Sequence, residues 1–293
     1  MLNQVAAIAE QLGLNLKQLG VLLLLLALVF IPIERLWPRQ RQKICRPDFL
    51  TDLAYYFFGG TLTALLLMLV SPMLLWLMQG VVPGRWLHWV TGQPGWLLLL
   101  LSLLLGDLAY YWAHRWSHQV PWLWQFHAIH HSAERMDWLV NTRTHPVDAT
   151  YTRCIVLVPS YLLGLMQGGL AGAGSLVVAV TLFNRFWTSF VHANVRWRLR
   201  WLDGLISTPA FHHWHHTNDG AAYVDKNYAA LFPLWDRMFG SFFLPEAFPQ
   251  RYGISQAVSP GFLHQLIRPL ARTGRDASGH PVNAGQNGPG SSP

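Results

Sequence analysis

The sequence GDLAYYWAHRWSH, residues 106–118, decides how we expect this chain to fold. An apolar run ends here in His114 and His118, which are four residues apart and therefore share one face of a helix. Two similar groups follow, HAIHH at 127–131 and HHWHH at 212–216. Most of the 14 histidines of the chain lie between residues 107 and 219.

Within each group, intervals of three and four residues place imidazoles on one side of a helix. The in-phase histidines are His114, His118, His127, His130, His131, His212, His215 and His216. His213 is out of phase with its neighbours. Since one transition metal takes about four to six ligands, the three groups together predict two metal ions. His145 and His192 lie between the second and third groups, and His192 shares a helix face with Thr188.

The composition indicates a membrane protein. Of the 293 residues, 52% are hydrophobic and only 12% are charged, against a usual charged share of about 25%. The net charge of +7 suits contact with anionic lipid headgroups, and we expect no binding to nucleic acid. Cys45 and Cys154 are the two cysteines, which excludes a disulfide framework and a thiolate metal site.

Apolar runs predict an all-α integral membrane helical bundle of about four to five spans, capped by a cytoplasmic histidine-rich helical domain. The expected spans are residues 19–33, 53–84, 96–112 and a helical hairpin at 154–184 that turns near the glycines of 167–174. A basic loop follows the first span, so the positive-inside rule places this loop and the histidine groups in the cytoplasm and the N-terminus outside. No cleavable signal peptide is expected.

We expect three regions: residues 1–48, with the first membrane helix and the basic loop; residues 49–255, with the histidine groups; and a tail at 256–293, disordered over 272–293 because of its Gly, Ser, Pro and Asn content. Asp107 lies seven residues before His114 and is a candidate to hydrogen-bond a ligating imidazole. Thr188 and Asp225 are further candidates for this role.

The histidine groups lack the residues of a metallohydrolase. There is no His-Glu-x-x-His, and no group contains a glutamate that would act as general base. Imidazole suits iron, copper, zinc and nickel alike. A metal centre beneath an apolar bundle can meet a lipid chain, and breaking an unactivated C–H bond needs a redox metal and O₂, which excludes zinc for that role.

The chain resembles the fatty acid hydroxylase/sterol desaturase superfamily of membrane di-iron enzymes. The resemblance covers roughly residues 50–255, and its last motif is most similar to the bacterial and alkylglycerol-monooxygenase-like branches. The similar motifs are GDLAYYWAHRWSH (106–118), HAIHHS (127–132), RTHP (143–146), FVHANVR (190–196), TPAFHHWHH (208–216) and DKNYAALFPLWDRMFGSF (225–242).

This resemblance implies two non-haem iron ions, O₂ as co-substrate, a lipid substrate, an external electron-donor protein and a bacterial inner membrane. It implies hydroxylation, desaturation or ether cleavage through C–H oxidation. The implied metal ligands are the eight in-phase histidines together with His192 and His145. Two positions depart from the family pattern: Thr188 stands where some relatives have histidine, and His213 stands where arginine is common.

Three alternatives remain at the level of sequence. The first is a histidine-rich membrane protein for metal binding or transport without redox catalysis. The second is a haem protein, and the third is a family member whose zinc site is purely structural. Transport sites usually lie near the bilayer midplane, whereas these groups follow the apolar spans. The sequence does not choose among sterol, fatty acyl, carotenoid and ether lipid substrates.

Overall fold

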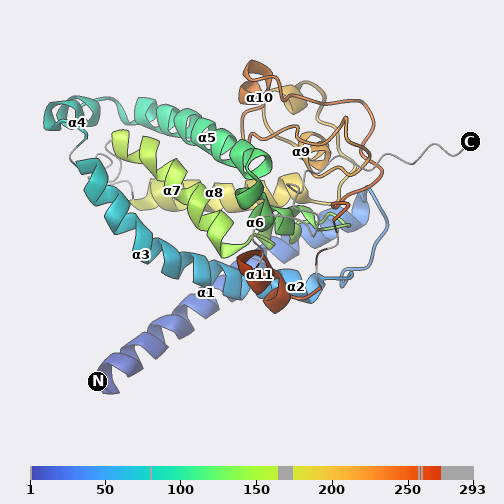
Figure 1. Cartoon of the computed structure of the whole chain (residues 1–293), viewed down its shortest axis with the longest axis horizontal. Coiled ribbons are helices and arrows are strands. Elements are labelled where there is room, and N and C mark those ends of the chain that lie inside the picture. Colours follow the sequence, from blue (N-terminus) through green and yellow to red (C-terminus); the bar gives the residue numbers. More distant parts are fainter. Residues whose placement is uncertain (1, 80, 164–173, 257, 259, 272–293) are drawn as a thin grey trace, which may run out of the picture.

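The computed structural model describes residues 2–79, 81–163, 174–256, 258 and 260–271, and it confirms the all-α prediction (Figure 1). Within these residues, strand pairing is limited to two isolated bridges, Pro38–Val195 and Thr217–Tyr252. The α-helices are α1 (Leu2–Leu36), α2 (Phe49–Ala54), α3 (Gly60–Gln79), α4 (Gly84–Thr91), α5 (Gly95–Gln119), α6 (Pro121–His131), α7 (Pro146–Leu162), α8 (Gly174–His192), α9 (Pro209–His215), α10 (Leu234–Met238) and α11 (Phe262–Ala271).

Three helical segments of the described chain are long and apolar enough to cross a membrane: Leu16–Leu36, Phe49–Met78 and Gly95–Gln119. They coincide with the first three predicted spans. The second contains a π-helical turn at Tyr55–Gly59, which joins α2 to α3. In the region of the predicted fourth and fifth spans, α7 and α8 flank residues that lie outside the description, and the expected glycine-rich turn falls almost wholly on them. The disorder expected at 272–293 also falls outside the described residues.

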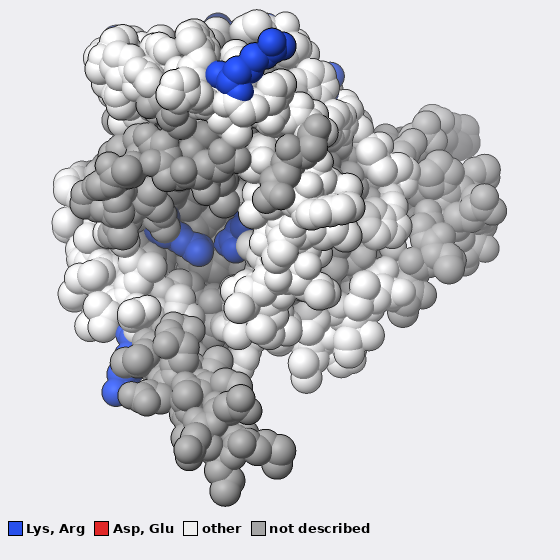
Figure 2. Space-filling model, turned by 90° about the vertical axis from the view of Figure 1, so that its left-hand side faces the viewer, with Lys and Arg blue, Asp and Glu red and all other residues white. Residues whose placement is uncertain are grey.

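The surface of the bundle fits an apolar environment. Figure 2 shows a face built mainly of uncharged residues, with no acidic residue visible on its described part and a hollow that contains Lys or Arg side chains. Large apolar side chains such as Met68, Leu69 and Trp76 of α3 are exposed by 70% or more. In water such a surface would lower solubility, whereas in a bilayer it faces hydrocarbon.

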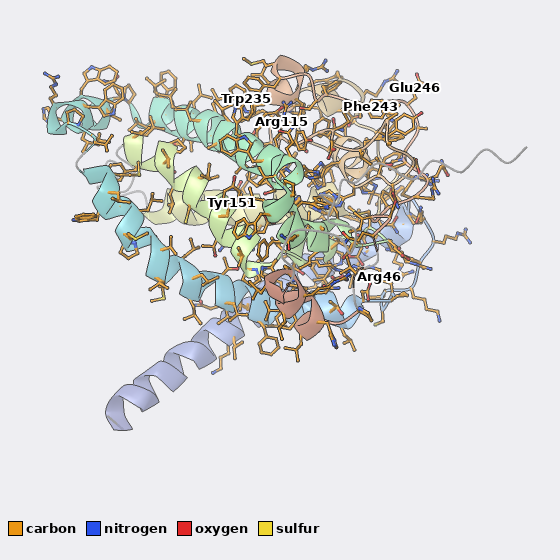
Figure 3. All side chains as sticks on the ribbon, in the orientation of Figure 1. Arg46, Arg115, Tyr151, Trp235, Phe243 and Glu246 are labelled. Carbon is orange, nitrogen blue, oxygen red and sulfur yellow. The ribbon has the colours of Figure 1, made fainter. Side chains whose placement is uncertain are left out.

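The helices bring the histidine groups to one end of the bundle. α7 packs against both α3 and α5, and α8 packs against α1 and α9. Figure 1 shows α4 at one end of the molecule, with α9 and α10 toward the other. Figure 3 shows Phe243 and Glu246 at that second end, while Tyr151 lies among the helices of the bundle. The end of α5 with His114 and His118, and α9 with the third histidine group, therefore lie away from α4.

An apolar cluster fixes the ends of α1 and α8 beside this cap. Phe30 of α1 is fully buried and stacks on Trp138 with ring centroids 6.2 Å apart. Val191 and Ala193, on either side of His192, belong to the same cluster. Burial of each large apolar side chain contributes about 1.5–3 kcal/mol, so this packing holds His192 in place.

The tail contains a helix that was not expected. α11 packs against α2 and α6, and its Phe262 ring meets Tyr55 edge to face with centroids 4.8 Å apart. Its apolar residues occur at helical spacing, with Leu263, Ile267 and Leu270 exposed. Residues 262–271 therefore belong to the folded unit rather than to a loose tail.

Candidate metal centre

Four helices deliver nine histidines to one place. α5 carries His114 and His118 at its end, α6 carries the second histidine group, α8 ends at His192, and α9 with the residue after it carries the third group. α9 is only seven residues long, and the residue before it, Thr208, caps it with a hydroxyl that accepts a hydrogen bond from the Phe211 amide. This cap compensates for the shortness of the helix.

The nine side chains form two groups, and in each group the ligand atoms lie within 4.8 Å of one another. The first group is His114, His118, His127, His131 and His215; the second is His130, His192, His212 and His216. The sequence groups do not map onto these spatial groups, because α6 and the α9 segment each contribute to both. The two groups touch: the rings of His131 and His216 stack with centroids 4.4 Å apart.

Six of the rings are held through Nδ1 by a protein oxygen. The acceptors are Tyr228 O for His114 (2.8 Å), Asp225 Oδ1 for His118 (3.0 Å), Asp148 Oδ2 for His127 (2.9 Å), Arg143 O for His130 (3.2 Å), Thr188 O for His192 (2.7 Å) and Lys226 O for His215 (2.8 Å). Since carbonyl and carboxylate oxygens only accept, each Nδ1 carries the proton. In the neutral ring Nε2 then has a lone pair.

The Nε2 atoms of neighbouring rings face one another with their lone pairs. Nε2 of His114 lies 3.1 Å from Nε2 of His127, and Nε2 of His192 lies 3.3 Å from Nε2 of His130. Two acceptors at this distance repel unless a cation lies between them. Metal–imidazole bonds of about 2.0–2.1 Å, as for zinc, separate adjacent ligand nitrogens by about 2.9–3.4 Å. The donor set therefore fits a bound metal ion in each group.

Unpartnered nitrogens and burial support the same conclusion. Nε2 of His118 and His215 and Nδ1 of His212 and His216 are buried without a hydrogen-bond partner among the described residues. Burial, together with the neighbouring imidazoles, lowers the pKa of His131 and His215 well below 6.5. These two rings therefore stay neutral near pH 7, which is the form that binds metal.

A loop at Asp225–Tyr228 positions three rings of the first group. Asp225 and Asn227 have positive φ angles of 58° and 61°, a conformation that asparagine and aspartate tolerate better than most residues. The Asn227 amide donates to Phe211 O at 2.8 Å and to Phe243 O at 2.7 Å, and its oxygen accepts from the Phe243 amide. The loop thus presents the Asp225 carboxylate and two carbonyls toward the histidines.

Asp107, which was expected to touch an imidazole, has other partners. Its oxygens accept from the backbone amides of Leu231 and Phe232 at 2.9 and 2.8 Å. It therefore fixes the chain just after the 225–228 loop. Of the other two candidates, Asp225 makes the expected contact, while Thr188 contacts His192 through its carbonyl and uses its hydroxyl on Asn184 O and Asn141.

His145 and His213 lie outside both groups. His145 caps α7, where its Nδ1 accepts from the Val147 amide at 3.1 Å and its Nε2 donates to Leu266 O at 3.0 Å. Both of its nitrogens are used, and we leave it out of the proposed ligand set. His213 contacts Tyr252 Oη and Ala193 O, in keeping with its phase in the sequence.

Two supporting features were not anticipated from the sequence. Asp148, in the first turn of α7, accepts from His127 and also from the Ser117 hydroxyl. Arg143 is fully buried and pairs with Asp52 at 2.5 Å, and Asp52 also pairs with Arg46 at 2.6 Å. Because Arg143 O holds His130, this charge network extends to the second group. In the sequence, the RTHP motif at 143–146 was the one indication that the chain around Asp148 lies near the histidine groups.

Comparisons with known proteins show that this chain is similar to enzymes named as lipid hydroxylases, monooxygenases and desaturases. The fatty acid hydroxylase family profile matches residues 99–241. The chain is 34% identical over 189 residues to the ornithine lipid hydroxylase OlsE of Rhizobium tropici, covering 64% of this chain and 54% of that protein. It is 35% identical over 144 residues to alkylglycerol monooxygenase of Homo sapiens, covering 48% of this chain and 30% of that protein.

A Delta(7)-sterol 5(6)-desaturase, ERG3B of Gibberella zeae, is 27% identical over 203 residues, which cover 65% of this chain and 53% of that protein. No solved structure matches. The chain spans about half the length of OlsE and ERG3B and less than a third of human alkylglycerol monooxygenase. These matches confirm the resemblance to the fatty acid hydroxylase/sterol desaturase superfamily that the motifs indicated.

Proposed function

We propose that this chain is an O₂-dependent membrane oxidoreductase that uses two non-haem iron ions to hydroxylate or desaturate a C–H bond of a lipid. The observation that carries the proposal is the pairing of Nε2 lone pairs between rings whose Nδ1 atoms already donate to protein oxygens. The names of the similar proteins, a lipid hydroxylase, a monooxygenase and a sterol desaturase, support lipid oxidation.

The two spatial groups would each hold one ion. When bound and reduced, iron supplies the redox chemistry with O₂ that breaks an unactivated C–H bond, which no side chain can do. The protein supplies neutral imidazoles, fixes their tautomers through the Nδ1 acceptors, and keeps water away by burying nearly every ring. Such fixed hydrogen bonds keep ligands in one orientation and strengthen metal binding.

The bundle would deliver the lipid. Apolar helices lead directly into the centre, because α5 carries His114 and His118 at the end of a candidate span. The basic residues after α1 support a cytoplasmic position for the centre in a bacterial inner membrane. Electrons would come from a separate donor protein. Whether the product is an alcohol or an alkene depends on substrate placement at a scale of about 1 Å.

The proposal is tested with full-length protein purified without added metal and reconstituted in lipid. We expect two iron atoms per chain and, with O₂ and a chemical reductant, lipids whose mass rises by one oxygen atom or falls by two hydrogen atoms. Comparing lipids of cells with and without the gene identifies the substrate. Iron-loaded protein that leaves every lipid unchanged, or that carries metal across vesicle membranes, would favour the alternative of metal binding or transport.

A further inference from the structure

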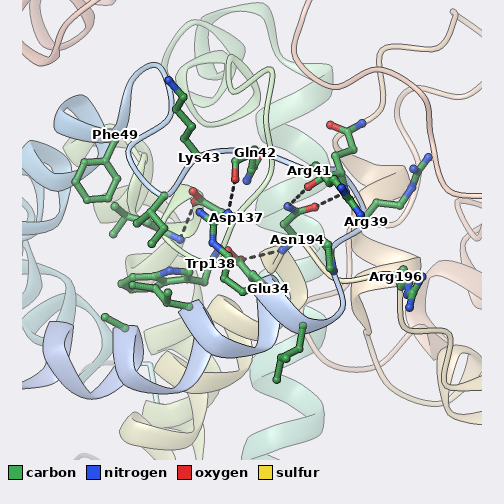
Figure 4. Close-up of a pocket in the computed structure, with 18 of the residues that line it drawn as sticks. Glu34, Arg39, Arg41, Gln42, Lys43, Phe49, Asp137, Trp138, Asn194 and Arg196 are labelled. Carbon is green, nitrogen blue, oxygen red and sulfur yellow. Dashed lines mark hydrogen bonds between the residues drawn. The ribbon is translucent and has the colours of Figure 1, made fainter.

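A pocket lies apart from the histidine rings of the proposed metal centre, where α1 ends and the basic loop begins. It has a volume of 680 Å³ and is lined by the end of α1, residues 38–44, Phe49 and Leu53, and the segments around Asp137 and Asn194 (Figure 4). It contains none of the nine proposed metal ligands.

Five cations line this pocket: Arg35, Arg39, Arg41, Lys43 and Arg196. Figure 4 shows Lys43 on one side of it and Arg39, Arg41 and Arg196 on the other. Within the described part of the chain, none of the five forms an ion pair. Arg35 and Arg39 donate only to backbone carbonyls, those of Gln42 and Pro249.

The two carboxylates of the pocket do not neutralise these cations. Asp137 pairs with the buried guanidinium of Arg46 at 2.6 Å. Glu34 Oε1 accepts hydrogen bonds from the backbone amides of Trp138 and Asn194 at 2.8 and 2.9 Å. Both groups are occupied within the fold, so the pocket keeps a positive charge that suits an anion.

The other part of the pocket is apolar and belongs to a membrane span. Leu23, Ala27 and Ile31 recur every four residues along one face of α1, inside the span Leu16–Leu36. Leu53 of α2 lies in the second candidate span. A ligand that fills the pocket therefore meets cations at one end and a hydrocarbon-facing helix at the other.

We propose that this pocket binds an anionic phospholipid, with the phosphate among Arg41, Lys43 and their neighbours and an acyl chain along Leu23, Ala27 and Ile31 of α1. Basic pockets at the ends of membrane helices are suited to lipid headgroups. An acidic protein would meet the cations but would leave the apolar face of the span unfilled, so the lipid is the better fit.

A phospholipid bound in this pocket would stabilise the metal centre without touching the histidines. Leu23, Ala27 and Ile31 pack against the apolar cluster that contains Val191 and Ala193, the neighbours of His192. A lipid in the pocket would press α1 against this cluster. The bound lipid would act by holding α1 against the end of α8. It would take no part in the oxidation reaction.

The test is a titration of delipidated full-length protein in detergent with phosphatidylglycerol, phosphatidylcholine or inorganic phosphate, followed by native mass spectrometry and thermal unfolding. We expect tight retention of phosphatidylglycerol and a rise in Tm. The Arg41→Gln/Lys43→Gln variant should bind it roughly 25-fold more weakly, at about fivefold per cation. Arg135→Gln/Arg200→Gln removes two exposed cations outside the pocket and is the matched control.

A second variant, Ala27→Leu, fills the apolar part and keeps every charge. We expect it to weaken phosphatidylglycerol binding as well. Three results would overturn the proposal. Equal retention of phosphatidylcholine would indicate nonspecific lipid contact, and an equal loss of binding in the control variant would indicate general charge attraction. Full competition by inorganic phosphate would indicate a site for a free anion. Lipid retention in native mass spectrometry needs neither bound metal nor turnover, so this readout is independent of the proposed oxidation.

Discussion

The Nδ1 atom of His127 donates to Oδ2 of Asp148 at 2.9 Å, and Nε2 of the same ring lies 3.1 Å from Nε2 of His114. One side chain is thus held from behind by a buried carboxylate while its free lone pair points at another ligand. The same arrangement, with a carbonyl in place of the carboxylate, recurs for His130 and His192. This pattern is the physical reason why we propose a metal centre here.

Replacing Asp148 with alanine should weaken metal binding in the first group. The carboxylate fixes the tautomer of His127 and increases the basicity of its ring, and losing such a partner costs about 10–100-fold in metal affinity. Asp148→Asn keeps an acceptor oxygen without the charge and should lose less. Iron content after dialysis against a graded chelator measures the effect. Glu134→Gln, at an exposed position, is the control and should leave iron content unchanged.

His130→Ala and His145→Ala should behave differently. His130 belongs to the second group, so its removal should deplete iron and abolish product formation. His145 caps α7 and contacts α11, and its removal should lower stability by about 1 kcal/mol, as for other caps, with iron content retained. Metal analysis and thermal unfolding of the two variants separate these outcomes. Loss of iron in His145→Ala at unchanged Tm would show that this histidine is a ligand after all.

Asn227→Ala should disturb the first group more than the second. At a φ angle of 61° alanine is less favourable than asparagine, which tolerates the left-handed region better, and the substitution also removes three hydrogen bonds to Phe211 and Phe243. Asn227→Gly relieves the backbone cost but still lacks these bonds. We expect the iron content to be highest in the wild type, lower in the glycine variant and lowest in the alanine variant. An alanine variant with full iron content would mean that the 225–228 loop does not position the rings.

The buried charge network should matter for stability. Asp52 pairs with both Arg46 and Arg143, so Asp52→Ala leaves two buried guanidinium groups undercompensated and should cost about 3–5 kcal/mol. Asp48→Asn is a matched comparison, because Asp48 touches Arg143 at 3.4 Å with a partly exposed carboxylate. Thermal unfolding in detergent should show a large drop for the first variant and a small one for the second.

Helical spacing predicted much of the centre. Intervals of three and four residues identified eight histidines that the fold brings together, and the phase of His192 on its helix pointed it to the same place. His213 was out of phase with its neighbours and stands where the family commonly has arginine, and it lies outside both groups. These relations are local, within one or two turns of a helix, and local geometry is what a sequence pattern encodes.

The remaining features depend on contacts between distant segments. The distribution of each histidine motif over two spatial groups depends on how α6 and α9 cross. Carbonyl acceptors such as Tyr228 O have no side-chain signature in the sequence. The helix phase of Asp107 was consistent with a histidine partner, but the amides of Leu231 and Phe232, more than a hundred residues away, are the groups that it meets.

Anomalous diffraction at the iron absorption edge, from crystals of the full-length protein purified without added metal, tests the central claim most directly. We predict two iron peaks, one among His114, His118, His127, His131 and His215 and one among His130, His192, His212 and His216. A single peak, or peaks that appear at the zinc edge with none at the iron edge, would contradict the account.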